Sequence, residues 1–142
     1  MLSGMTSPPF HLAFPVRDIA STRRFYGDVL GCEEGRSADR WIDYDFFGHQ
    51  LSAHVTPSAE RAGTNPVDGD EVPIPHFGVV LDLATFDTVL ERLRAADVGF
   101  LIGPRTRFEG EPGEQSTMFV QDPSGNVLEF KAFGERESLF RS

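Results

Sequence analysis

The sequence has 142 residues, of which 39% are hydrophobic, and a formal net charge of −9 at pH 7. This length is typical of a single domain with a sizeable core, and the acidic charge argues against nucleic acids and anionic membranes as partners. No apolar run approaches the roughly 20 residues of a transmembrane helix, and residues 1–9 do not resemble a signal peptide. A single cysteine, Cys32, excludes an internal disulfide and fits a reducing compartment. We therefore expect one cytoplasmic domain over residues 1–142.

The first part of the chain predicts a strand, a helix and three further strands. Residues 10–16 place apolar side chains on one face and His11 on the other, which is typical of a strand. Asp18 can cap a helix whose apolar residues recur at helical spacing until Gly31, a natural stop. The three strands that follow are expected at residues 34–37, 41–47 and 49–56.

Residues 57–73 have a different composition, rich in proline, glycine and acidic side chains and without an apolar period. This composition predicts a linker or surface loop, and a loop of this length usually acts as a lid or joins two units. The pattern then restarts with a strand at 76–81 and a helix that Asp82 can cap and Gly99 can end. Beyond the helix we expect strands at 100–102, 116–121 and 127–133, and a polar loop at 104–115.

The chain therefore reads as two copies of a βαβββ module. Each copy opens with a strand led by a histidine and closes with a glycine turn followed by a strand. We predict an α+β fold in which the two modules form a cupped, mostly antiparallel mixed sheet with the helices on its outer face. The predicted divisions are module 1 at 10–56, the linker at 57–73, module 2 at 75–133 and a tail at 134–142.

Three residues of the repeat form a candidate metal site. If each helix covers the apolar face of its sheet, then His11, His76 and Glu129 lie on the opposite, concave faces. Imidazole and carboxylate ligands suit Fe(II), Mn(II), Ni(II) or Zn(II), and three ligands leave positions open for substrate and O₂ or water. Aligned from the glycine turns, Ser52 matches Glu129, although Gln50 shares its face and would replace it after a two-residue slip. Each residue alone also fits a structural or solvated strand position, and only the combination favours a metal site.

Four segments of the chain resemble the vicinal oxygen chelate superfamily. This superfamily includes glyoxalase I, extradiol ring-cleaving dioxygenases, fosfomycin-resistance thiol transferases and bleomycin-binding proteins. The resemblance implies paired βαβββ modules around a divalent metal, with His11, His76 and Glu129 as its ligands. It also implies a small-molecule substrate, and many members dimerise, so a homodimer is among the expected assemblies. The resembling segments are residues 11–19, 24–31, 75–79 and 121–130.

The resemblance leaves several functions open. We predict an Fe(II)-dependent enzyme similar to extradiol dioxygenases that acts on a small molecule with adjacent oxygens; Ni, Mn and Zn are alternative metals. The alternatives are a glyoxalase-like lyase or isomerase, a fosfomycin-type thiol transferase, and a metal-free binding or resistance protein. The dioxygenase tyrosine has no clear match in residues 117–120, and a potassium-binding loop of the fosfomycin type is not evident.

Three further side chains are candidates for roles around this site. His54 is the candidate for catalytic proton transfer, and its alternative role is a polar residue lining the cleft. Arg105 and Arg107 lie in the predicted polar loop, where they would either pair with an anionic substrate or remain exposed charges.

Overall fold

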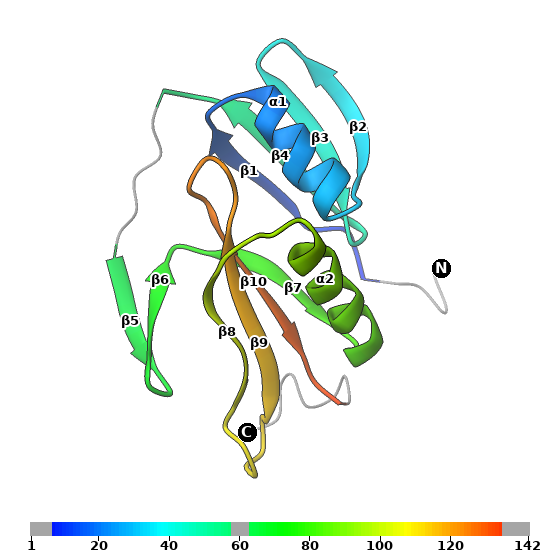
Figure 1. The fold of residues 1–142 in the computed structure, drawn as a ribbon. Helices are drawn as coiled ribbons and strands as arrows, with labels where there is room; N and C mark the ends of the chain where they lie inside the picture. The colour runs from blue at the N-terminus through cyan, green and yellow to red at the C-terminus, as the bar shows by residue number, and fades with distance from the viewer. Residues whose placement is uncertain (1–6, 58–62, 135–142) are drawn as a thin grey trace.

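A computed structural model describes residues 7–57 and 63–134, and both halves of the chain fold as βαβββ units (Figure 1). In each sheet the first and last strands of the unit are parallel neighbours and the remaining pairs are antiparallel, in the orders β1-β4-β3-β2 and β7-β10-β9-β8. The predicted α+β fold with mixed, mostly antiparallel sheets is therefore confirmed. The first unit contains β1 (His11–Val16), α1 (Ile19–Thr22), the π-helix η1 (Arg23–Val29), β2 (Glu33–Ala38), β3 (Trp41–Phe46) and β4 (His49–Val55). The second contains β7 (Phe77–Leu81), α2 (Leu83–Ala95), β8 (Phe100–Arg107), β9 (Gln115–Gln121) and β10 (Val127–Ala132).

Both helices begin where the sequence predicts, because Asp18 and Asp82 each accept a hydrogen bond from the backbone N–H three residues further on. The first helix then widens into η1, in which the Leu30 N–H donates to the Phe25 carbonyl at 2.9 Å. This wider turn lets two successive aromatic residues, Phe25 and Tyr26, both point into the core. None of the helices in the described residues is long and apolar enough to cross a membrane.

The sequence predicts a linker or surface loop at residues 57–73, but the structure has strands there. Its described part forms a hairpin of β5 (Gly63–Val67) and β6 (Asp70–Ile74). The turn between these strands is Asp68-Gly69, and both residues have positive φ angles, 45° and 87°. Asp-Gly is a favoured pair in two-residue hairpin turns, so the sequence did carry a signal for this hairpin. The predicted polar loop at 104–115 was also partly wrong, because β8 continues to Arg107.

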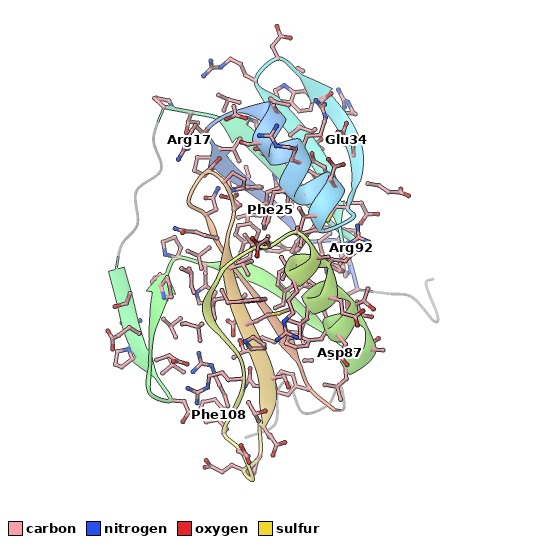
Figure 2. The ribbon with its side chains drawn as sticks, viewed as in Figure 1. Arg17, Phe25, Glu34, Asp87, Arg92 and Phe108 are labelled. Carbon is pink, nitrogen blue, oxygen red and sulfur yellow. The ribbon has the colours of Figure 1, made fainter. Side chains whose placement is uncertain are left out.

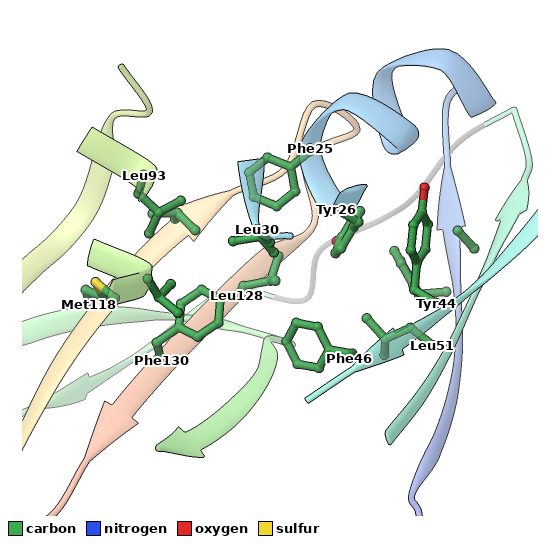
Figure 3. Packing of buried hydrophobic residues seen from close by; sticks show 14 of the residues in the cluster. Phe25, Tyr26, Leu30, Tyr44, Phe46, Leu51, Leu93, Met118, Leu128 and Phe130 are labelled. Carbon is green, nitrogen blue, oxygen red and sulfur yellow. The ribbon is translucent and has the colours of Figure 1, made fainter. Parts of the chain in front are cut away.

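The core joins the two units on the helical side of their sheets (Figure 3). Aromatic rings meet across the junction: Phe46 and Phe130 have centroids 6.2 Å apart, and Phe14 and Phe77 have centroids 5.2 Å apart. Because side chains alternate along a strand, burial of Phe130 on this side places its neighbour Glu129 on the opposite, concave side. The core therefore determines which side chains reach the concave faces.

A second link between the units runs from helix to helix. Arg92 of α2 lies at the end of η1 (Figure 2), where its Nε donates to the Val29 carbonyl at 2.8 Å and its Nη2 to the Asp28 carbonyl at 3.2 Å. Carbonyls at a helix C-terminus lack intrahelical partners, and a positive charge there is favourable. Arg92 therefore binds the end of η1 to α2.

A third link is centred on the buried carboxylate of Asp122, in the turn before β10. The Tyr26 hydroxyl donates to Asp122 Oδ2 at 2.8 Å, and Asn126 Nδ2 donates to the same oxygen at 2.9 Å. The backbone N–H groups of Ser124 and Asn126 donate to Oδ1, both at 2.9 Å. Asn126 Nδ2 also donates to the Pro15 carbonyl of β1 at 2.7 Å. Burial, together with the nearby Asp122 charge, raises the pKa of Tyr26 well above its ordinary value, so the phenol remains a donor.

We predict that Tyr26→Phe lowers the free energy of unfolding by about 1.5–3 kcal/mol, because a donor to a buried carboxylate is lost. Tyr44→Phe is a matched control, since Tyr44 is equally buried but its hydroxyl has no hydrogen-bond partner among the described residues. Removing that hydroxyl should leave the free energy unchanged or raise it. Urea unfolding of the two variants measures the difference, and equal losses would show that the Asp122 link contributes nothing specific.

Candidate metal centre

His76 and Glu129 meet on the concave face of the second sheet. His76 Nε2 lies 3.1 Å from Glu129 Oε1, and the carboxylate is buried while the imidazole is partly exposed. The pair depends on a close approach of β7 to β10 at Gly78. A Cβ atom added at Gly78 would lie 1.6 Å from the Glu129 carbonyl oxygen, so no larger residue fits there. The sequence prediction that these two residues share a concave face agrees with this geometry.

The outer atoms of both side chains are held by hydrogen bonds. His76 Nδ1 lies 2.7 Å from the Pro73 carbonyl, and since a carbonyl only accepts, Nδ1 carries the proton. Thr117 Oγ1 donates to Glu129 Oε2 at 2.5 Å. The His76 ring also packs against Phe119 in a T-shaped contact, with centroids 4.9 Å apart. Partners of this kind orient metal ligands, and here they leave Nε2 and Oε1 facing one another.

The two side chains shift each other's protonation. The hydrogen bond to Glu129 raises the pKa of His76, although burial opposes it. Burial raises the pKa of Glu129, but the hydrogen bonds from His76 and Thr117 outweigh this effect and leave it below its ordinary value. Glu129 is therefore held as an anion, as a metal ligand must be.

A separate polar cluster lies on the concave face of the first sheet. His11 Nδ1 lies 2.8 Å from Gln50 Oε1, and Gln50 Nε2 lies 3.5 Å from Asp43 Oδ2. Ser52 Oγ donates to Asp43 Oδ1 at 2.6 Å. Asp43 was missed in the sequence analysis. The alternation in β3, with Ile42 buried on the helical side, would have placed Asp43 on the same face as Ser52.

The two clusters occupy equivalent places in the repeat. In the first sheet Ala13 lies opposite Ser52, and in the second Gly78 lies opposite Glu129. Ser52 therefore holds the place of Glu129, as the alignment of the two glycine turns predicts. A hydroxyl that donates to Asp43 stands where the other half has a carboxylate.

The two clusters do not form one metal site within the described part of a single chain. Over residues 7–57 and 63–134, no group of three or more histidine, cysteine, aspartate or glutamate side chains could hold a metal ion. The structure thus brings His76 to Glu129 and leaves His11 on the other sheet. His54 is exposed on β4, on the same face as Ser52 and two residues beyond it. The three-residue ligand set and the catalytic role of His54 both remain predictions.

The β5–β6 hairpin covers part of the second concave face. Val72 packs with Phe119 in a small apolar cluster on this face. Arg107 is buried, pairs with Asp70 at 2.9 Å, and donates to the Val67 carbonyl at 2.7 Å. Arg105 pairs with Asp68 at 2.9 Å and with Asp70 at 3.1 Å. The expectation that both arginines lie in a loop was wrong, because they belong to β8 and pair with the hairpin.

Two cavities flank His76. One of about 430 Å³ lies between β1, the start of β7 and the turn at 124–127, and His76 forms part of its wall. The other, of about 270 Å³, lies along β7 and is lined by His76, Glu129 and Lys131. Cavities of this size accept small organic molecules. A ligand in either one would lie next to the imidazole.

Residues 9–130 match the family model of the Glyoxalase/Bleomycin resistance protein/Dioxygenase superfamily. The chain belongs to this superfamily. Members typically use a divalent metal and bind small molecules. The superfamily predicted from the four sequence segments is therefore confirmed.

Individual relatives agree with this assignment. A glyoxalase/bleomycin resistance protein/dioxygenase from Alicyclobacillus acidocaldarius is 32% identical, with a TM-score of 0.77 over 94% of this chain and 97% of that one. Virulence protein STM3117 of Salmonella typhimurium is 28% identical over 87% of this chain and 82% of its own length. The fosfomycin resistance protein FosX of Listeria monocytogenes has a TM-score of 0.68 over 96% of this chain and 100% of that one. At 18% identity, FosX supports the fold alone.

Proposed function

We propose that this protein is a metal-dependent enzyme that acts on a small molecule with two adjacent oxygens. The observation that carries the proposal is the His76–Glu129 pair, whose Nε2 and Oε1 lie 3.1 Å apart. Their outer atoms are held by Pro73 and Thr117, so Nε2 and Oε1 are both directed to one point. One imidazole nitrogen and one anionic carboxylate oxygen suit a first-row divalent metal.

The third ligand in this proposal is His11 of a second copy of the chain. Within one chain His11 lies on a different sheet from His76 and Glu129, yet it occupies the repeat position equivalent to His76. A symmetric dimer that places the first sheet of one copy against the second sheet of the other would complete two identical sites. The homodimer is therefore part of the proposed function.

The residues around the site have separate tasks in this proposal. A divalent metal bound there would stabilise negative charge on two adjacent substrate oxygens. The cavity of about 430 Å³ between β1, the start of β7 and the turn at 124–127 would hold the rest of the substrate. Thr117 would keep the second oxygen of Glu129 occupied, so that one oxygen remains for the metal.

Redox-neutral chemistry of the lyase, isomerase or transferase kind is favoured over ring cleavage. On β9 the residue paired with Glu129 is Phe119, and the neighbour on the same face is Thr117, already engaged with the carboxylate. The tyrosine that extradiol dioxygenases use for proton transfer thus has no counterpart on this strand. The Fe(II) dioxygenase remains the second candidate, because two histidines and one carboxylate with open positions are the set found in non-haem iron oxygenases.

We predict roughly one divalent metal per chain in the purified protein. His11→Ala and Glu129→Ala should each abolish metal retention, whereas Glu91→Ala, on the exposed face of α2, should not. Dimers formed from a mixture of the first two variants should regain about one quarter of the wild-type metal content, since half of them contain one intact site. Elemental analysis of each sample gives the answer. A monomeric protein, or metal retained by Glu129→Ala, would contradict the proposal.

We further predict that protein reconstituted with Fe(II) without oxygen, then given catechol and air, takes up no oxygen above a metal-free control. Turnover of a hemithioacetal, or thiol addition to an epoxide, should instead depend on the metal and not on oxygen. An oxygen electrode and absorbance of a yellow ring-opened product measure the first reaction. Metal-dependent oxygen uptake with that product would establish the dioxygenase in place of the redox-neutral enzyme.

A further inference from the structure

The cluster on the first concave face forms a continuous chain of hydrogen bonds. It runs from His11 Nδ1 to Gln50 Oε1 at 2.8 Å, and from Gln50 Nε2 to Asp43 Oδ2 at 3.5 Å. The other oxygen of Asp43 accepts from Ser52 Oγ at 2.6 Å, which fixes the direction of the carboxylate. Asp43, Gln50 and Ser52 lie next to each other on β3 and β4, and Gln50 lies opposite His11 on β1.

The chemistry of these groups determines which one donates in each of these hydrogen bonds. A carboxylate only accepts hydrogen bonds, so Asp43 turns the NH₂ group of Gln50 toward itself. The amide oxygen of Gln50 then faces His11, and this oxygen also only accepts. His11 Nδ1 must therefore carry a proton, and in the neutral ring Nε2 then keeps its lone pair. One carboxylate thus sets the tautomer of an imidazole with which it makes no direct hydrogen bond.

In the second half of the chain a different acceptor holds the proton on the histidine Nδ1. There the Pro73 carbonyl accepts directly from His76 Nδ1 at 2.7 Å, and Nε2 faces Glu129 Oε1 at 3.1 Å. Two histidines at equivalent repeat positions therefore both carry a proton on Nδ1, although the groups that accept it are unrelated. In both halves the Nε2 side of the ring is thereby the side left to face a ligand or an acidic group, which in the second half is Glu129.

We propose that Asp43 is a positioning residue that acts through Gln50 to hold His11 in its Nδ1–H tautomer, with Nε2 available to a metal. The consequence for metal binding rests on the proposed function. The tautomer itself does not, because it follows from contacts within one metal-free chain. Ser52 assists by holding the carboxylate in place, which gives a role to the residue that replaces a fourth ligand.

The test compares Asp43→Asn with Asp87→Asn, a control with the same change of charge on the exposed face of α2 (Figure 2). An amide at position 43 can donate as well as accept, so the Gln50 amide is free to turn over and the Nε2–H tautomer of His11 becomes populated. Imidazole ¹³C and ¹⁵N chemical shifts of the metal-free protein, recorded above the range where histidine is charged, report the tautomer. Metal affinity should fall about 10- to 100-fold in Asp43→Asn and stay at the wild-type value in Asp87→Asn.

A rescue variant separates positioning from simple damage to the fold. Asp43→Asn combined with Gln50→Glu moves the carboxylate to position 50, where it accepts from His11 Nδ1 directly. This double variant should restore both the Nδ1–H tautomer and metal affinity. If Asp43→Asn does not fold, Gln50→Leu tests the same idea, because it removes the acceptor and leaves the Asp43–Ser52 contact in place.

An unchanged His11 tautomer in Asp43→Asn or Gln50→Leu would overturn the inference, whether or not the protein binds metal. A wild-type protein that binds no metal, combined with a shifted tautomer in Asp43→Asn, would remove the proposed function and leave the positioning role standing. A shifted tautomer that the double variant does not restore would also overturn the inference, because damage to the fold would then explain the shift.

Discussion

The hydrogen bonds to the Asp122 carboxylate hold the two halves of this protein in one arrangement. Its oxygens accept from Tyr26 of the first unit and from the turn that starts β10 in the second. A buried carboxylate is costly unless it is fully hydrogen-bonded, so the carboxylate stabilises only a chain in which Tyr26 and the turn meet. The widened helix η1 makes the meeting possible, because it directs Tyr26 into the core beside Phe25. The relative placement of the two sheets, and so of their concave faces, depends on this arrangement.

The concave faces show how one repeat has produced two different half-sites. Glu129 and Ser52 hold equivalent places, but Glu129 is an anion that faces a histidine, whereas Ser52 donates to Asp43. The second half offers two candidate metal ligands, His76 and Glu129, whose outer atoms are held by Pro73 and Thr117. The first half offers one histidine, His11, whose tautomer we propose to depend on Asp43 acting through Gln50. In the proposed function, a site built from both halves needs a second copy of the chain, so catalysis would depend on dimer formation.

The sequence was sufficient to predict the two modules, because strand alternation, aspartate caps and glycine turns are local signals and the repeat supports each of them. It was also sufficient to predict that Ser52 matches Glu129. The β5–β6 hairpin was missed although Asp68-Gly69 is a signal for its turn, because its short strands contain prolines and acidic residues and gain stability from Arg105 and Arg107, distant in sequence. Asp43 was missed because a carboxylate on a strand usually faces solvent; alternation along β3 predicts its face, but its role becomes visible in its contacts with Ser52 and Gln50. The separation of His11 from His76 is a property of packing between the modules, which local patterns do not encode.

The central claim is that His76 and Glu129 of one chain and His11 of another hold a single metal. Diffraction from metal-soaked crystals, recorded on both sides of the absorption edge of the metal, tests this most directly. We expect one anomalous peak per chain, within about 2.0–2.2 Å of His76 Nε2, a Glu129 oxygen and the Nε2 of His11 from a second copy. A peak elsewhere, or at His76 and Glu129 with His11 absent from its ligands, would contradict the account.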